Sequence, residues 1–307
     1  MTSDPAGFSA QWLALREPFD HAAREAGAPQ LGLPEHIARW RRAGAGSRAG
    51  GVLGVLDLGC GHGANLRALA PRLGGLQRWR LVDHDPGLLA AVPEALARWS
   101  RQQGYHFTQP GDASDAGPCC ITGPSFCAEV LRQRIDLARD LSSLDLAQPA
   151  LITASALLDL VSAAWLQRLI QRARDAGAAM LLALTVDGRS AWQPADPDDE
   201  AVHALFSRHQ RRDKGFGPAL GPQAPAVALQ QMANAGYQTT MARTDWLIAG
   251  AQAAALQRAM IEGIAAAARE QDPTAHDLVT AWQSRREACV GTSSLRVGHV
   301  DIVASLP

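Results

Sequence analysis

The sequence lacks an excess of charge of either sign. Its 307 residues carry 29 basic and 30 acidic side chains, interspersed along the chain, so the formal net charge is −1. Binding to a nucleic-acid backbone needs a clear basic surface. The one basic cluster, formed by Arg39, Arg41, Arg42 and Arg48, is better explained as a solvated helix end. We therefore expect no nucleic-acid partner.

The sequence is also poor in cysteine and has no long apolar run. Its five cysteines lack the spacing of a secreted disulfide framework. Cys119, Cys120 and Cys127 form no CxxC motif and have no nearby histidine pair, so we expect structural thiols and no metal. The longest apolar run, AGAAMLLALTV, is too short to cross a bilayer, and MTSDPAGFSAQW does not have the pattern of a signal peptide. A cytoplasmic protein without a membrane partner is expected.

Apolar residues, in contrast, make up 47% of the chain, which is enough for a full core. Residues 8–43 have helical periodicity, broken at GAPQLGLPEH, and 44–51 form a flexible joint. Strand, helix, strand and helix then follow over 52–104, which is the order of a parallel α/β sheet. Further strands are predicted at 129–135, after a hairpin excursion, and at 149–158 and 176–188.

The last third of the chain departs from this alternation. A polar stretch rich in proline and glycine is followed by a helix, an extended segment and two helices joined at Pro273, and LRVGHVDIVAS forms a final strand. The predicted regions are a helical cap over 1–50, an α/β core over 51–249 with a lid-like excursion at 190–222, a helical insertion over 250–290, and the final core strand at 291–307.

A glycine-rich turn joins the first predicted strand to its helix in LDLGCGHGANL. Gly59, Gly61 and Gly63 carry no Cβ, so the backbone there can approach a ligand closely. A dinucleotide fingerprint reads GxGxxG, whereas GCGHGAN places the third glycine one residue early. Asp83 and Asp85 follow the second strand, where the ribose of an adenosine-containing ligand would lie. The turn alone leaves the choice of ligand open.

The motifs VLDLGCGHGAN, LVDHDP, RIDL and LITASALLDL, in this order, resemble those of class I S-adenosylmethionine-dependent methyltransferases. The resemblance covers about residues 51–190 and the last strand. It implies a Rossmann-like α/β sheet, mostly parallel with an antiparallel last strand, and helical cap elements. It also implies S-adenosylmethionine as cofactor and methyl transfer (EC 2.1.1) to an O or N atom of a small molecule. A homodimer is compatible with the sequence. A protein of this fold with other chemistry, or a nicotinamide-dependent oxidoreductase, is the alternative.

Carried over position by position, the resemblance implies a set of cofactor contacts. Asp57 would lie near the methionine ammonium, Asp83 would accept hydrogen bonds from the ribose hydroxyls, and His84 would flank the adenine. The remaining implied contacts are Gly59, Cys60, Gly61, Asn65 and Ser155.

The acidic residue that would contact the adenine has two candidates. Asp136 in RIDL, with the backbone of Leu137, is favoured because it precedes the next strand by a connection of ordinary length. Asp112 in GDA stands much farther from that strand and remains the alternative.

Methyl transfer from a sulfonium is an in-line displacement, so the protein mainly aligns the acceptor and excludes water. Only a poor nucleophile such as a hydroxyl needs a general base. Asp159 follows the fourth strand and is a candidate base, although it could equally complement a helix dipole. The stretch HQRRDKGFGPALGP suits a glycine-hinged lid and supplies the other predicted catalytic groups, His209, Asp213 and Lys214.

Overall fold

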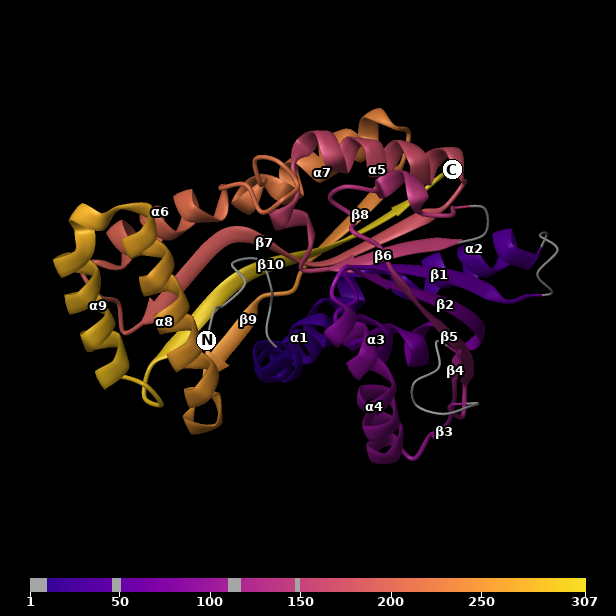
Figure 1. The fold of residues 1–307 in the computed structure, drawn as a ribbon, viewed down its shortest axis with the longest axis horizontal. Helices are drawn as coiled ribbons and strands as arrows, with labels where there is room; N and C mark the ends of the chain where they lie inside the picture. Colours follow the sequence, from indigo (N-terminus) through magenta and orange to yellow (C-terminus); the bar gives the residue numbers. More distant parts are fainter. Residues whose placement is uncertain (1–9, 46–50, 110–116, 147–149) are drawn as a thin grey trace.

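A computed structural model of the protein describes residues 10–45, 51–109, 117–146 and 150–307. These residues form one sheet with helices on both faces (Figure 1). The strands are β1 (Leu53–Leu58), β2 (Gly75–Asp83), β3 (His106–Thr108), β4 (Cys119–Thr122), β5 (Phe126–Arg134), β6 (Leu151–Ser155), β7 (Ala179–Gln193), β8 (Gln238–Arg243), β9 (Trp246–Ala249) and β10 (Ser294–Ser305). The helices are α1 (Ala10–Leu31), α2 (Leu33–Ala45), α3 (Ala64–Leu73), α4 (Pro86–Gln103), α5 (Ala163–Asp175), α6 (Asp199–Gln210), α7 (Ala224–Asn234), α8 (Ala254–Gln271) and α9 (His276–Ala288).

The strand order is β3-β4-β5-β2-β1-β6-β7-β10-β8, with β9 paired to β10. Strands β5, β2, β1, β6 and β7 are parallel, whereas β10 runs antiparallel between β7 and β8. This topology confirms the predicted Rossmann-like methyltransferase sheet with an antiparallel last strand. The strand order reverses between β1 and β6, which is the point where open α/β sheets bind ligands.

Local sequence explains the elements that surround this switch point. Strand β1 is almost entirely buried because it is covered on both faces. Helix α4 begins where the Asp85 side chain accepts hydrogen bonds from the backbone N–H groups of Gly87 and Leu88, and it ends at Gly104, whose φ is +70°. Helix α5 is capped by Ser162, which accepts a hydrogen bond from the backbone N–H of Trp165. These caps determine where each strand end turns into its helix.

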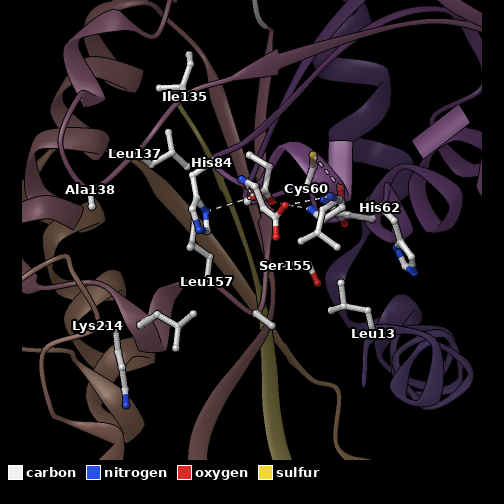
Figure 2. A pocket seen from close by; sticks show the side chains of 18 of the residues that line it. Leu13, Cys60, His62, His84, Ile135, Leu137, Ala138, Ser155, Leu157 and Lys214 are labelled. Atoms are coloured by element: carbon white, nitrogen blue, oxygen red, sulfur yellow. Dashed lines mark hydrogen bonds and ion pairs between the residues drawn. The ribbon is translucent and has the colours of Figure 1, made fainter. Parts of the chain in front are cut away.

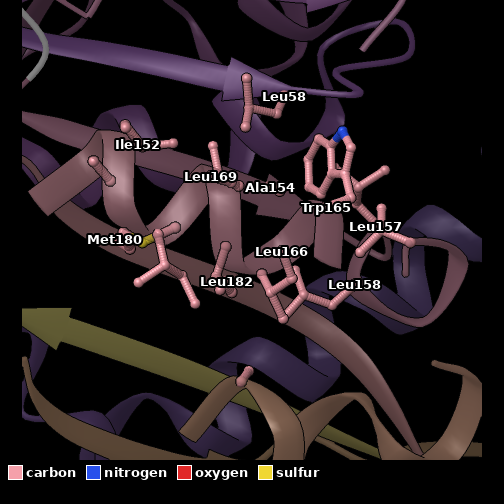
Figure 3. Close-up of a cluster of buried hydrophobic side chains, with 14 of the residues drawn as sticks. Leu58, Ile152, Ala154, Leu157, Leu158, Trp165, Leu166, Leu169, Met180 and Leu182 are labelled. Atoms are coloured by element: carbon pink, nitrogen blue, oxygen red, sulfur yellow. The ribbon is translucent and has the colours of Figure 1, made fainter. Parts of the chain in front are cut away.

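Hydrophobic clusters fill both faces of the sheet. Helices α5 and α7 cover one face, and α2, α3 and α4 lie against the other (Figure 1). Figure 3 shows the first cluster, in which the α5 side chains contact the strands; its labelled members are Leu58, Ile152, Ala154, Leu157, Leu158, Trp165, Leu166, Leu169, Met180 and Leu182. A third cluster joins β7 to α6, α8 and α9 and includes Trp192 and Trp282. No helix in the described ranges is long and apolar enough to span a bilayer.

Several element boundaries differ from the sequence prediction. Strand β7 continues to Gln193 instead of ending near Gly188, because β10 pairs with it along nearly its whole length. The first four residues of the expected excursion at 190–222 are therefore strand. The break between α1 and α2 is the single residue Gly32, with φ +57°. The predicted hairpin is formed by β4 and β5, and β5 begins at Phe126, before the predicted 129.

Candidate active site

The carboxyl ends of β5, β2, β1 and β6 open into one cavity of about 550 Å³ (Figure 2). Its volume lies within the range of about 300–1,000 Å³ that is usual for small-molecule sites. The turn after β1, the end of β2 and the loop after β5 form one part of the wall, and α1 and residues 214–216 form another. The predicted residues that line it are Gly59, Cys60, Gly61, Asn65, Asp83, His84, Asp136, Leu137, Ser155 and Lys214.

The glycine turn is locked to the end of β2 by one carboxylate. Gly59 and Gly61 have φ values of +63° and +54°, which side-chain-bearing residues rarely adopt. The backbone N–H of Gly61 donates to Asp83 Oδ2 at 2.9 Å, and the N–H of Asp85 donates to Asp83 Oδ1 at 3.0 Å. His84 Nδ1 lies 3.3 Å from Asp83 Oδ1. The Asp83 carboxylate therefore lies between the glycine turn after β1 and His84 at the end of β2.

Cys60, between these glycines, is a buried thiol. Its Sγ donates to the carbonyl of Gly61 at 3.5 Å, and burial raises the pKa of the thiol well above its ordinary value. A protonated buried thiol is a poor nucleophile. The Cys60 thiol is therefore no candidate nucleophile, and its backbone N–H donates to the Val82 carbonyl at 3.0 Å.

Asp57 lies behind the cavity wall, not in it. Its side chain is fully buried, and Oδ1 accepts a hydrogen bond of 2.7 Å from Asn65 Nδ2, which also donates to Thr153 Oγ1. Among the described residues, Asp57 Oδ2 has no hydrogen-bond partner. Burial raises the pKa of Asp57 to about 7, although the Asn65 hydrogen bond and the charge of Arg24 oppose the shift. Asp57 reaches the cavity through Asn65.

Arg24 of α1 completes this buried network. Its Nη1 donates to Asn65 Oδ1 at 2.9 Å and its Nη2 to Ser155 Oγ at 2.6 Å. Arg24 is 5% exposed, and the carboxylates of Asp301 and Asp57 help to offset the burial of its charge. A buried cation is costly unless it is paired and hydrogen-bonded, and only Nη1 and Nη2 of Arg24 have hydrogen-bond partners among the described residues, whereas Nε has none. The network connects α1 to the ends of β1 and β6.

A partly buried ion pair also joins α1 to α3 beside the glycine turn. Arg67 of α3 donates through Nε to Glu17 Oε1 at 2.8 Å and through Nη2 to Glu17 Oε2 at 2.7 Å. Leu13 of α1 faces Gly61, and a Cβ on that glycine would lie 3.2 Å from Leu13 Cδ1. The predicted helical cap therefore forms part of the cavity wall.

The loop after β5 provides the opposite end of the cavity. Asp136 Oδ1 accepts hydrogen bonds from the backbone N–H groups of Ala138 and Arg139, which fixes the turn. The Leu137 carbonyl accepts a bond of 2.7 Å from Trp165 Nε1, while no described residue accepts a hydrogen bond from the Leu137 N–H. Asp136 and Leu137 both line the cavity, and their contact with an adenine stays a prediction. The alternative, Asp112, lies outside the described residues.

Of the four predicted catalytic residues, only Lys214 lines the cavity. Asp159 follows β6 between two lining residues, Leu157 and Leu160. Its Oδ1 is buried and has no hydrogen-bond partner in the part of the chain that the structure describes. Burial raises the pKa of Asp159 to about 6, and the positive charge of Arg16 limits that shift. Asp159 is thus close to the site but not on its surface.

The other two predicted catalytic groups are engaged elsewhere. His209 Nε2 lies 3.2 Å from Glu270 Oε2 on α8, so this histidine faces the outer helices. Asp213 Oδ1 accepts hydrogen bonds from the N–H groups of Gly215 and Gly217, at 2.7 and 3.0 Å, and so shapes the turn that holds Lys214. Neither residue lines the cavity in this structure, and their catalytic roles stay predictions. The mobility expected of this segment as a lid stays a prediction.

Arg16 and Asp20 of α1 line the cavity and were missed by the sequence interpretation. Arg16 Nε donates to Asp20 Oδ2 at 2.9 Å, and Trp246 Nε1 donates to Asp20 Oδ1 at 3.0 Å. The Arg16 guanidinium also lies over the Trp246 ring, 5.4 Å from its centroid. The signal available was the four-residue spacing of Arg16, Asp20 and Arg24, which places them on one helix face.

The five cysteines are free thiols, and the described residues include no group of three or more His, Cys, Asp or Glu side chains suited to a metal ion. Cys119, Cys120 and Cys127 lie on the paired strands β4 and β5.

The sheet topology defines a Rossmann-like α/β fold with a cavity at its switch point. No family model matches the sequence, and no curated protein matches it. Similar solved structures include a cyclopropane-fatty-acyl-phospholipid synthase-like protein from Lactobacillus casei (14% identity, 97% of this chain and 94% of that chain covered, TM-score 0.44). Geranyl diphosphate C-methyltransferase from Streptomyces coelicolor is 13% identical (90% and 81% covered, TM-score 0.39). A possible exported protein from Bordetella parapertussis is 15% identical (89% and 68% covered, TM-score 0.40). Similarity this low decides neither family nor reaction.

Proposed function

We propose that this protein is a class I methyltransferase that transfers a methyl group from S-adenosylmethionine to an O or N atom of a small molecule. The observation that carries the proposal is the position of Asp83. Its carboxylate is 6% exposed, lines the cavity at the end of β2 and is held by the turn after β1. A carboxylate in this position of a Rossmann-like sheet suits the vicinal hydroxyls of a ribose.

The same geometry disfavours a nicotinamide dinucleotide. In dinucleotide sites, the N–H groups of the glycine turn and the following helix face the pyrophosphate. Here the N–H of Gly61 already donates to Asp83, and Asp85 adds a second carboxylate at the same wall. A pyrophosphate would meet negative charge where it needs donors. The sulfonium and ammonium groups of S-adenosylmethionine are cations, so its charge suits this wall.

The chain's own residues would divide the binding work along the cavity. Asp83 would accept hydrogen bonds from the ribose, and Asp136 with the available N–H of Leu137 would contact the adenine. Asn65 and Ser155, oriented by Arg24, would contact the amino-acid end. When bound, the cofactor supplies a methyl group on a sulfonium centre that is already a good leaving group. What remains for the protein is to align the acceptor and exclude water.

Asp159 lies behind the cavity wall, and we assign it to accept the acceptor's proton, after its side chain turns toward the cavity, when a hydroxyl is methylated. Because its pKa is raised to about 6, it is ionised at neutral pH yet basic enough to take a proton. Its buried Oδ1 has no partner among the described residues, so no hydrogen bond to that atom needs to break before it acts. Its position between Leu157 and Leu160 places it next to the cavity wall.

Calorimetric titration with S-adenosylmethionine, S-adenosylhomocysteine and NAD tests the proposal. Asp83→Ala should weaken binding of both adenosyl ligands by about 2 kcal/mol, or about thirtyfold, because hydrogen bonds to a charged acceptor are lost. Asp277→Ala, at a fully exposed carboxylate, is the matched control and should change nothing. Tighter binding of NAD than of S-adenosylmethionine would contradict the proposal. Adenosyl binding without transfer of labelled methyl groups to any metabolite would favour other chemistry on this fold.

A further inference from the structure

The end of the cavity away from the predicted ribose site has charged side chains, one of which has no ion-pair partner among the described residues. Three lining side chains there carry charge: Arg16 and Asp20 on α1, and Lys214 on the loop after α6. Arg16 and Asp20 form an ion pair, whereas Lys214 forms none within the described residues. The Lys214 ammonium is thus a cation at the cavity wall without a carboxylate partner among the described residues. An anion is the ligand that would neutralise it.

Lys214 is chemically distinctive in this chain. Of its 29 basic side chains, Lys214 is the only lysine. Every other strong cation is an arginine. The planar guanidinium of arginine and the compact ammonium of lysine are not interchangeable. Figure 2 shows Lys214 across the cavity from Leu13, with its Nζ pointing away from His84 and the glycine turn. A compact cation therefore stands on the wall opposite α1, outside the predicted adenosine site.

The loop that carries Lys214 is firmly anchored on both sides of that residue. Asp213 closes the turn through the N–H groups of Gly215 and Gly217. Phe216 contacts Trp165 edge-on, with ring centroids 5.3 Å apart. Lys214 is half-buried, so its ammonium is held near the cavity at low entropic cost.

Arg16 offers a second set of donors at the same end. Its Nε is used by Asp20, but no residue in the described ranges accepts a hydrogen bond from its terminal Nη1 and Nη2 groups. The guanidinium is held by Asp20 and by the face of Trp246, so its orientation is already determined. A guanidinium fork fixed in this way matches the two oxygens of a carboxylate.

We propose that the methyl acceptor is a small amphipathic carboxylate, whose anionic group is held by Lys214 and by the free donors of Arg16. The apolar part would contact Leu160 and Phe216, which also line the cavity. This inference rests on the proposed function, because it assigns the acceptor of that reaction.

The test uses the full-length protein saturated with S-adenosylhomocysteine and pairs of probes that differ in charge but hardly in shape. These are phenylacetate with phenylacetamide, and hexanoate with hexanamide, and their dissociation constants are measured by ligand-observed NMR. Each carboxylate should bind about tenfold or more tightly than its amide. Lys214→Met should bring this ratio close to one without changing the affinity for S-adenosylhomocysteine. Lys214→Arg should recover part of the preference, and Arg101→Met, at an exposed helix end, should have no effect.

Each other outcome has a definite meaning. Equal binding of acid and amide, or no carboxylate binding at millimolar concentration, overturns the inference while leaving the cofactor assignment intact. A carboxylate preference that survives Lys214→Met removes Lys214 from the acceptor site. If the wild-type protein binds no S-adenosylhomocysteine, the proposed function itself fails, and the two failures are thereby distinguished.

Discussion

Replacing Asp57 by asparagine should remove a loss of folding stability that occurs in the wild type as the pH rises. Asp57 is fully buried beneath the glycine turn, and its pKa rises from 3.8 to about 7, mainly because burial disfavours the charged carboxylate. A shift of about three units corresponds to about 4 kcal/mol, at about 1.4 kcal/mol for each unit. Since the folded-state pKa is the higher one, the folded form binds the proton more tightly. The stabilising contribution is therefore complete below the unfolded pKa and is lost as pH rises to about 7.

Asparagine is nearly isosteric with aspartate and keeps an oxygen that can accept from Asn65 Nδ2, but it has no charge to bury. The free energy of unfolding of Asp57→Asn should therefore increase relative to that of the wild type, by up to about 4 kcal/mol, as the pH rises from about 4 to about 8. Urea titrations followed by tryptophan fluorescence at several pH values measure this difference. Contributions from other groups, such as Asp159, are present in both proteins and cancel.

Asp277→Asn is the matched control, because this carboxylate is fully exposed at the first turn of α9. Its stability should run parallel to the wild type across the same pH range. A constant difference between Asp57→Asn and the wild type from acid to neutral pH would refute the reasoning, because it would mean that Asp57 has similar pKa values in the folded and unfolded states.

Three further predictions follow from the site. Methyl transfer should fall as pH drops below about 6, because Asp159 is protonated there, and Asp159→Asn should abolish this limb of the pH–rate profile, which an unchanged limb would contradict. Arg67→Met should lower the free energy of unfolding by about 1 kcal/mol because it removes the partner of the partly exposed Glu17, and adding Glu17→Gln should restore part of it in urea titrations. Gly61→Ala should weaken S-adenosylhomocysteine binding measured by calorimetry, since φ is +54° and the new Cβ would lie 3.2 Å from an α1 side chain; Gly51→Ala, with φ +82° and nothing within 4 Å, should leave binding unchanged.

The sequence alone determined the fold class and the cofactor half of the candidate site. Short-range patterns specify the strand ends, the glycine turn and Asp83. In these patterns, apolar runs, glycines and carboxylates follow one another over a short stretch of strand, turn and helix. The parallel order of β1 and β2 follows from the helix between them, and it brings Gly61 and Asp83 together.

The α1 side of the cavity was decided only by tertiary contacts. Asp20 meets Trp246 across 226 positions of sequence, and Arg24 meets Ser155 across 131, so no local pattern announces either contact. His209 was a candidate base in the sequence, and its Nε2 lies 3.2 Å from Oε2 of Glu270, 61 residues away. Local spacing specifies which side chains share a turn or a helix face, whereas packing between distant elements decides which of them face the same cavity and which are already paired.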